Sequence, residues 1–279
     1  MRRALASEIA RACHLLHERG WVANHDGNVT ARDGARLLAT PTATSKRLVT
    51  EASLLEVDLR GQVMGGTGKV FGELGLHLVV YERRPDVGAV VHAHPPMATA
   101  VASSPRAEAI LARPFLPEAV VSLGPVVPTV PLALPGEAAR QALAPWCEWV
   151  DVVLLANHGV LAWGATVEQA LLRLELVEHL ARIAISAEPL GGVRPLPDAF
   201  VESLMPARAK AGLGRAADRA VEVAARLAGT PSAGKGVVAC APAPHSSTVV
   251  LEPPRAREPD LIAVVREEIM RALRESSAP

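Results

Sequence analysis

The chain has little cysteine, few aromatic residues and no excess of either sign of charge. Its three cysteines, Cys13, Cys147 and Cys240, are far apart and form no CxxC pair, which argues against a disulfide framework and is typical of a reducing compartment. Lysine plus arginine number 29, as do aspartate plus glutamate. Because the chain therefore lacks the basic footprint of nucleic-acid-binding proteins, we expect no nucleic-acid partner.

The N-terminal segment lacks the apolar core, about 7 to 15 residues long, of a secretory signal peptide. Residues 1–8 read MRRALASE and lead into a helical pattern of apolar residues at Leu5, Ile9, Cys13 and Leu16. We therefore expect neither a signal peptide nor a membrane span, and a cytoplasmic location. With 279 residues, 49% of them hydrophobic, the chain is long enough for one large core and an appendage.

What the sequence does contain is a pair of histidines, His92 and His94, in a run that reads as a β-strand, Val-Val-His-Ala-His-Pro. Side chains alternate between the two faces of a strand, so both imidazoles point to the same side. Two neutral imidazoles can supply two ligands to zinc or a similar divalent metal. The alternative is an ordinary core or edge role, because a chain with nine histidines readily contains an HxH triplet by chance.

A third histidine follows another predicted strand. Asn157-His158-Gly159 comes directly after the apolar run of residues 152–156, so His158 lies at the end of that strand. Three protein ligands with an open fourth position are typical of a catalytic metal site, whereas structural zinc sites are closed by four ligands.

A carboxylate belongs to the same part of the chain. Apolar residues recur at helical spacing after Glu73, namely Leu74, Leu78 and Tyr81. This pattern places Glu73 at the N-terminus of a helix running to about Arg84, where the helix dipole favours a negative charge. Residues 85–88 then turn the chain into the strand of His92, which makes one helix-turn-strand unit. An ordinary first-turn acid is the alternative interpretation of Glu73.

Five short blocks together resemble the class II aldolase/adducin family and, within it, the L-fuculose-phosphate aldolases. The blocks are Gly27-Asn28-Val29-Thr30, residues 40–46 (TPTATSK), the segment around Glu73, His92-Ala93-His94-Pro95 and Asn157-His158-Gly159. The resemblance covers about residues 1–190. It implies an α/β fold with a central, mostly antiparallel sheet flanked by helices.

The same resemblance implies a function. His92, His94 and His158 would bind one zinc ion per subunit, and Glu73 would be the catalytic acid/base. The reaction would be the zinc-dependent cleavage of a ketose 1-phosphate, such as L-fuculose 1-phosphate, to dihydroxyacetone phosphate and lactaldehyde. The family example is a homotetramer whose sites lie between subunits.

The phosphate-binding loops depart from the family pattern. The residues that the resemblance assigns to them are Gly27, Asn28, Thr42 and Ala43. Ala43 stands where glycine is usual, and Phe71-Gly72 replaces a Ser-Ser pair. The loss of two hydroxyl donors would weaken phosphate binding by a few kcal/mol, at about 1.5–3 kcal/mol for a hydrogen bond to a charged group. Lys46 is either a compensating positive charge or a solvated surface lysine.

A second departure concerns the general acid. The family's aldolases are thought to protonate the aldehyde oxygen with a tyrosine, but the single tyrosine here, Tyr81, fits a packed core position. Glu118 is the polar alternative in the equivalent stretch. Other functions therefore stay open: a sugar-phosphate epimerase or dehydratase on the same metal scaffold, or a non-catalytic adducin-like assembly module. Retention of the three histidines and Glu73 argues against the last.

The remaining patterns predict further elements. The predicted strands are 28–32, 36–40, 54–58, 120–121 and 126–130, the first two joined by an Asp33-Gly34 turn and the last two at sheet edges because of nearby prolines. The predicted helices are 107–112, 136–146, 166–187 and 213–227. Thr166 to Gln169 reads as a capping box for the third of these helices.

We divide the chain into a catalytic domain, 1–190, a helical extension, 191–228, a linker, 229–257, and a C-terminal amphipathic helix, 258–275. Three interpretations compete for this helix. It packs on its own subunit, or it lies on a membrane surface, which its mixed polar face disfavours. Alternatively, linker and helix together resemble the encapsulation peptides of bacterial microcompartment cargo enzymes, whose partners are shell proteins and whose location is the microcompartment lumen.

Overall fold

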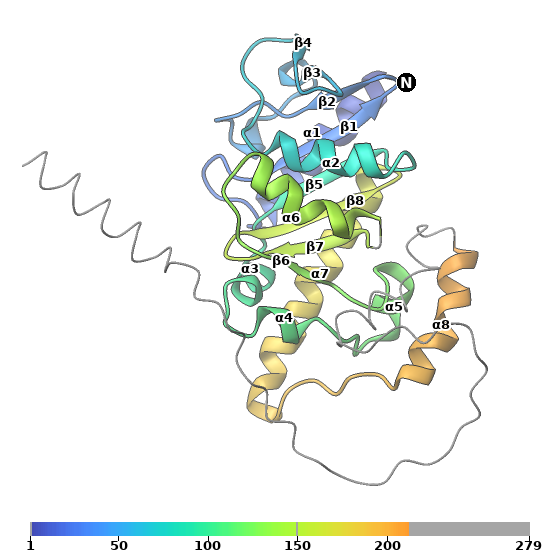
Figure 1. The fold of residues 1–279 in the computed structure, drawn as a ribbon. Helices are drawn as coiled ribbons and strands as arrows, with labels where there is room; N and C mark the ends of the chain where they lie inside the picture. The colour runs from blue at the N-terminus through green and yellow to red at the C-terminus, as the bar shows by residue number, and fades with distance from the viewer. Residues whose placement is uncertain (1, 149, 212–279) are drawn as a thin grey trace, which may run out of the picture. The chain divides into compact units, whose positions relative to one another are not determined.

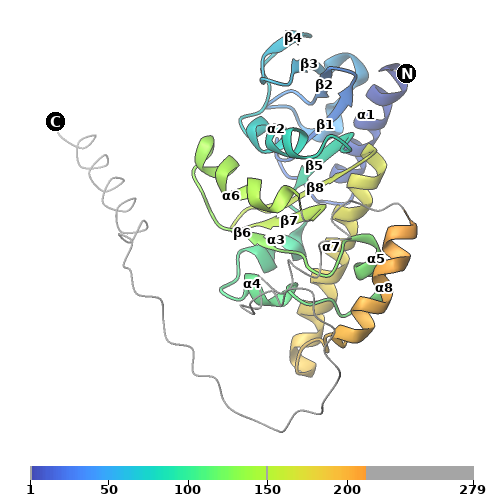
Figure 2. The same ribbon diagram turned by 45° about the vertical axis from the view of Figure 1, so that its right-hand side comes forward.

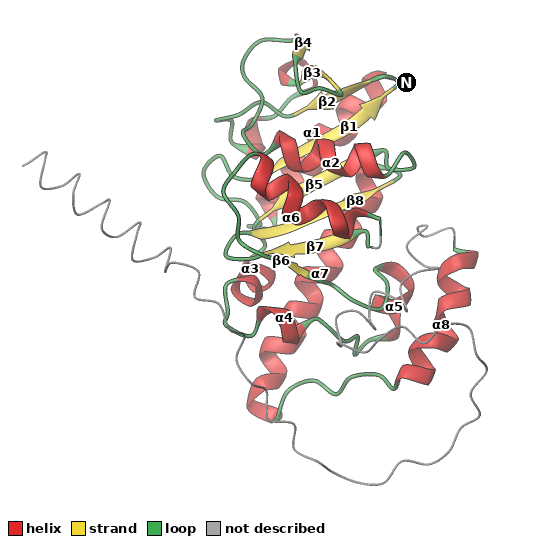
Figure 3. Ribbon diagram, viewed as in Figure 1, coloured by secondary structure: helices red, strands yellow, loops and turns green. Residues whose placement is uncertain are grey.

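The computed structural model describes residues 2–148 and 150–211. In this part of the chain a sheet lies between two groups of helices (Figures 1 and 3). The strand order is β4-β3-β2-β1-β5-β8-β7-β6. Neighbouring strands are antiparallel except for the parallel pair β6 and β7. The expected α/β class, with a mostly antiparallel sheet flanked by helices, is confirmed.

The strands are β1 Asn28–Asp33, β2 Arg36–Ala39, β3 Leu55–Asp58, β4 Val63–Gly65, β5 Ala89–Ala93, β6 Thr129–Val130, β7 Val152–Leu155 and β8 Gly159–Gly164. The α-helices are α1 Arg2–Glu18, α2 Leu74–Arg83, α3 Pro96–Ala102, α4 Ala107–Ile110, α5 Pro117–Ser122, α6 Glu137–Cys147, α7 Val167–Ala187 and α8 Asp198–Lys210. Short 3-10 turns lie at Lys46–Leu48, Glu51–Ser53 and Glu188–Leu190.

The sheet is covered on both faces. Helices α1, α3 and α7 pack on one face, and α2 and α6 pack on the other (Figure 2). The middle strand β5 shows the alternation: Ala89 and Val91 lie in the core beneath α1 and α7, while Val90 lies in the core beneath α2. His92 has the same parity as Val90, so its ring faces the side of the sheet where α2 begins.

Several predicted elements are confirmed with their local signals. Asp33 pairs with Arg36 across the hairpin of β1 and β2, and Gly34 has a φ of 62°, a left-handed conformation that favours glycine. The side chain of Thr166 accepts a hydrogen bond of 3.1 Å from the backbone N–H of Gln169, which caps α7 as expected. Helix α2 begins at Leu74, with Glu73 in the cap position.

Of the two predicted edge strands, 120–121 is wrong, and 126–130 is confirmed only over β6, which does lie at the edge of the sheet. Val120 and Val121 belong to helix α5, because Pro117 occupies the first helical turn, where its fixed φ favours a helix. Of the predicted strand 126–130, only β6 pairs with β7. Pro128 has no N–H to donate and instead accepts from Leu154 at 2.9 Å, so the ladder starts after it.

A buried ionic cluster ties α8 to the sheet. The Asp151 carboxylate, at the start of β7, contacts Arg84 at 3.0 Å, Arg173 at 3.0 Å and Arg208 at 2.8 Å. All four side chains are almost fully buried. Arg208 reaches this cluster from α8, so a residue outside the predicted catalytic domain completes the interior.

The predicted linker 229–257, the C-terminal helix 258–275 and the helix 213–227 lie outside the described residues. Among the described residues, none of the helices has the length and apolar content needed to cross a bilayer.

Candidate metal centre

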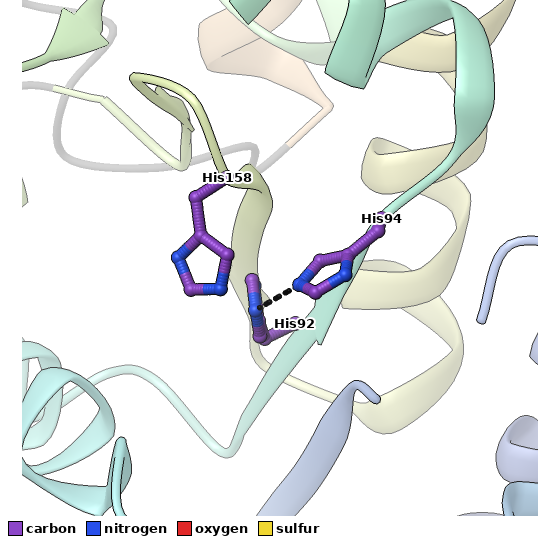
Figure 4. A group of neighbouring side chains, drawn as sticks. All are labelled: His92, His94 and His158. Carbon is purple, nitrogen blue, oxygen red and sulfur yellow. Dashed lines mark hydrogen bonds between the residues drawn. The ribbon is translucent and has the colours of Figure 1, made fainter. Parts of the chain in front are cut away.

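Three histidines converge at one end of the sheet (Figure 4). His92 is the fourth residue of β5, His94 follows the end of that strand, and His158 lies in the connection between β7 and β8. One nitrogen from each ring lies within 4.8 Å of the other two, and the ring centroids are 4.7 to 4.9 Å apart. Because β5 pairs directly with β8, the end of β5 lies next to the connection that carries His158.

The spacing fits a shared ion. Imidazole nitrogens about 2.0–2.1 Å from a tetrahedral zinc lie about 3.3 Å from each other. The Nε2 atoms of His92 and His94 are 3.1 Å apart, which is close to that value. The three histidines are therefore grouped closely enough to bind one divalent cation.

The ring of His92 is oriented by the backbone. Its Nδ1 lies 2.8 Å from the carbonyl oxygen of Val160 in β8, and because a carbonyl only accepts, Nδ1 carries the proton. The lone pair of the neutral ring is then at Nε2, the atom that faces His94. A metal-binding histidine commonly uses its second nitrogen in this way.

Two glycine-dependent close approaches bring the loops around the rings together. Gly27 has a φ of 71°, and a Cβ there would lie 2.9 Å from the carbonyl oxygen of His92. At Gly159 a Cβ would lie 2.5 Å from the carbonyl oxygen of Ala93. A side chain at either position would push a ring-bearing segment away.

Glu73 lies directly beside the histidines. Its Oε1 accepts a hydrogen bond from His158 Nε2 at 3.0 Å, and Oε2 is 3.5 Å from His92 Nε2. Asn28 Nδ2 donates to Oε2 at 2.8 Å. Burial acts to raise the pKa of the Glu73 carboxyl, but the hydrogen bond from His158, the charges of His92 and His158 and the hydrogen bond from Asn28 outweigh it and lower the pKa.

The histidines differ in proton affinity. Burial lowers the pKa of His92, and burial followed by the nearby His92 and His158 lowers the pKa of His94 to about 4. The hydrogen bond to Glu73 raises the pKa of His158. His92 and His94 are thus neutral at physiological pH, the form that binds a metal.

The residues assigned to phosphate binding are divided between two places. Gly27 and Asn28 adjoin the histidines, and the Asn28 amide is engaged with Glu73. Thr42 is exposed, and Ala43 lines an open cavity together with Asn24, His25 and Arg47. Ala43 has a φ of 52°, a left-handed conformation that explains why glycine is the usual residue there.

Lys46 is not a solvated surface lysine. It is 2% exposed, and its Nζ donates to the carbonyl oxygens of His25 at 3.1 Å and Thr44 at 2.9 Å. Burial lowers its pKa. Lys46 therefore joins the two loops on either side of the open cavity.

The two candidates for a general acid lie elsewhere. Tyr81 is buried as expected, 3% exposed, with its hydroxyl 2.9 Å from Thr30 Oγ1. Glu118 is exposed in the first turn of α5, and within the described residues it forms no hydrogen bond or ion pair with the histidines.

Sequence reasoning missed two groups beside the histidines. The Val160 carbonyl carries no sequence signal, because any residue supplies a carbonyl. Asp26, whose Oδ2 is 3.7 Å from His94 Nδ1, precedes the Gly27-Asn28 block and was not itself singled out. A carboxylate directly before this block was the signal that could have identified it.

Comparisons with known proteins agree with this architecture. Residues 7–185 match the model of the class II aldolase and adducin N-terminal domain. An L-fuculose phosphate aldolase of Methanococcus maripaludis is 30% identical over 173 residues, which cover 62% of this chain and 92% of that protein. A 3-oxo-tetronate 4-phosphate decarboxylase of Escherichia coli is 32% identical over 184 residues, which cover 64% of this chain and 85% of that protein. The crystal structure of YgbL from Klebsiella pneumoniae aligns with a TM-score of 0.68 and 30% identity, over 73% of this chain and 99% of that one.

Proposed function

This chain belongs to the class II aldolase and adducin family, and from that premise we propose that it is a zinc-dependent aldolase acting on a ketose 1-phosphate similar to L-fuculose 1-phosphate. The observation that carries the proposal is the position of Glu73, whose carboxylate contacts two of the three clustered histidines. A divalent cation held by His92, His94 and His158 would supply Lewis-acid polarisation of the substrate's carbonyl and hydroxyl oxygens.

Glu73 is the group that moves protons. As the C3–C4 bond breaks, its carboxylate accepts the proton of the C4 hydroxyl, and the aldehyde, lactaldehyde for L-fuculose 1-phosphate, leaves. The electron pair of the broken bond passes into the carbonyl of the dihydroxyacetone phosphate fragment. Glu73 then returns a proton to C3. The lowered pKa of Glu73 favours the carboxylate form that this first step requires.

A second candidate is a decarboxylase of a 3-oxo sugar-acid phosphate. The chain contains one tyrosine, and it is the buried Tyr81, so neither this subunit nor a second copy can offer a tyrosine to an aldehyde oxygen. Carbon dioxide leaves without needing such an acid, and only the carbon left behind takes up a proton. The similarity to a 3-oxo-tetronate 4-phosphate decarboxylase supports this candidate, which was not among the alternatives, an epimerase or a dehydratase, that the sequence left open.

A substrate panel separates the two candidates. The metal-loaded protein is incubated with L-fuculose 1-phosphate, L-rhamnulose 1-phosphate and 3-oxo-tetronate 4-phosphate, and both aldehyde and carbon dioxide are measured. An aldolase releases aldehyde from a ketose 1-phosphate, whereas a decarboxylase releases carbon dioxide from the acid. Elemental analysis of the same preparation should find about one zinc per chain. No product from any of the three substrates would favour the non-catalytic assembly module.

We further propose a homotetramer with sites between subunits, and microcompartment cargo targeting by the C-terminal segment 258–275. Support for the second point is the amphipathic pattern of that segment alone, since it lies outside the described residues. Removal of the residues after about 250 should leave turnover unchanged and abolish co-assembly with shell proteins. Unchanged encapsulation of the shortened chain would rule out this targeting role.

A further inference from the structure

The loop that precedes β1 is held against His92 in β5 and against His94, which follows that strand. The backbone N–H of His94 donates to the carbonyl oxygen of Trp21 at 2.9 Å. Gly27, at the other end of the loop, approaches the His92 carbonyl too closely for any side chain. Between these points Lys46 Nζ holds the carbonyl oxygen of His25. The side chain of Asp26 is therefore presented from a fixed backbone.

Asp26 is directed at His94. Its Oδ2 lies 3.7 Å from His94 Nδ1, and within the described residues this is the only ion pair that its carboxylate forms. The carboxylate is 43% exposed, so it can move by the roughly 1 Å that separates this distance from a hydrogen bond of about 2.8 Å.

The charge of Asp26 has the wrong sign for the phosphate-binding role that the family resemblance gives to its neighbours Gly27 and Asn28. A carboxylate in a loop that binds a phosphate dianion would repel it. Next to a cation held by neutral imidazoles, the same charge is favourable. Asp26 therefore fits the metal centre rather than the phosphate-binding role assigned to Gly27 and Asn28.

We propose that Asp26 is a positioning residue of the metal centre, which accepts the Nδ1 proton of His94 and keeps Nε2 of that ring available as a ligand. The inference rests on the metal centre of the proposed function. In this role Asp26 acts on His94 as the Val160 carbonyl acts on His92. Each accepts the proton of the ring nitrogen that does not bind the metal, which fixes the tautomer and the ring orientation.

The proton positions explain why the contact is 3.7 Å rather than a hydrogen bond. Because Nδ1 of His92 carries its proton, His94 Nε2 is the donor in the 3.1 Å contact between the two rings, and Nδ1 of a neutral His94 then has no proton to give. When Nε2 of His94 gives its lone pair to a cation, the ring proton sits on Nδ1. Asp26 is the acceptor in front of it.

The test compares cobalt(II) binding by the full-length wild type, Asp26→Ala and a matched control, Glu18→Gln. Glu18 is exposed near the same loop, and the control also removes one negative charge. Affinity is measured by chelator competition and by the cobalt absorption spectrum, alongside thermal unfolding of the metal-free proteins. Asp26→Ala should bind cobalt about 10–100-fold more weakly and show an altered spectrum, with metal-free unfolding unchanged. Glu18→Gln should match the wild type.

The outcomes separate this inference from the proposed function. Equal cobalt affinity of wild type and Asp26→Ala would overturn the role of Asp26 and leave the metal centre intact. If Asp26→Ala bound cobalt more weakly but its metal-free form also lost stability by a similar free energy, the role of Asp26 would again be overturned. A residue that only supports the fold predicts that result. Absence of cobalt binding by the wild type would overturn the metal centre and this inference together.

Discussion

Glu73 and His158 are joined by a hydrogen bond of 3.0 Å between Oε1 and Nε2, although they are 85 residues apart in the chain. His158 Nε2 cannot donate this proton and bind a cation at the same time. Metal binding through Nε2 of His158 would therefore free the Glu73 carboxylate for substrate protons and leave the proton of the neutral His158 ring on Nδ1. The proposed acid/base and the proposed metal ligand are coupled through one contact.

Replacement of the Glu73 carboxylate should separate binding from turnover. In Glu73→Gln the amide keeps the size and can still accept a hydrogen bond, but it cannot accept a proton. We expect zinc content to stay at about one per chain and kcat to fall by about 10²–10⁴-fold. The measurement is steady-state turnover on the substrate identified in the panel, with Glu82→Gln on the outer face of α2 as control. Full activity of Glu73→Gln would show that another group moves the proton.

Loss of any one of the clustered histidines should remove the metal. His92→Ala, His94→Ala and His158→Ala each leave two imidazoles, too few to hold zinc against a chelator. Elemental analysis after dialysis against EDTA should find close to no zinc in these variants, while the exposed His17→Ala retains the wild-type amount. Stoichiometric zinc in all three variants would place the metal site elsewhere.

His77 should make the fold sensitive to acid. Its ring is fully buried, and burial lowers its pKa to about 3, compared with about 6.5 in an unfolded chain. Above pH 6.5 both states are neutral and the free energy of unfolding does not depend on this group. As the pH falls from 6.5 towards 3, only the unfolded state takes up the proton, so stability declines by up to about 1.4 kcal/mol per pH unit.

Urea unfolding at pH 7 and pH 5 measures this dependence. His77→Gln retains a partner for Thr30 but does not titrate, so its free energy of unfolding should fall less between the two pH values. The exposed His17→Gln should behave as the wild type. An unchanged pH dependence in His77→Gln would assign the acid sensitivity to other groups.

The Asp151 cluster should be a large contributor to stability. Asp151→Asn leaves Arg84, Arg173 and Arg208 buried without their shared counter-charge, a change that typically costs about 3–5 kcal/mol. Urea unfolding measures the loss, and hydrogen exchange should show reduced protection in α8, which carries Arg208. Glu148→Gln, which breaks the exposed pair with Arg83, should cost no more than about 1 kcal/mol. Similar losses in both variants would contradict the cluster's role.

Much of the fold follows from local patterns. The hairpin at Gly34, the cap at Thr166 and the helix after Glu73 are specified by residues a few positions apart, so sequence predicts them well. The errors occur where local signals conflict. Val120 and Val121 favour a strand by type, but Pro117 and the packing of α5 against α8 favour a helix, and β-branched preference yields to such context.

The histidines and Glu73 were found from sequence because metal and acid/base chemistry need particular side chains at particular spacings. The same reasoning could not find the Val160 carbonyl or the pairing of Lys46 with two backbone carbonyls, since carbonyl groups are present at every residue.

By itself the sequence determined several of the central strands and helices, the alternation that points His92 and His94 to one face of their strand, and the residue types able to bind a metal. These depend on neighbours within a few positions, where backbone geometry is almost obligatory. Only the tertiary structure decided that β5 lies next to β8, that Asp26 faces His94 and that Lys46 is buried. Those contacts join segments far apart in the chain, and their formation depends on packing of the whole core rather than on any local preference.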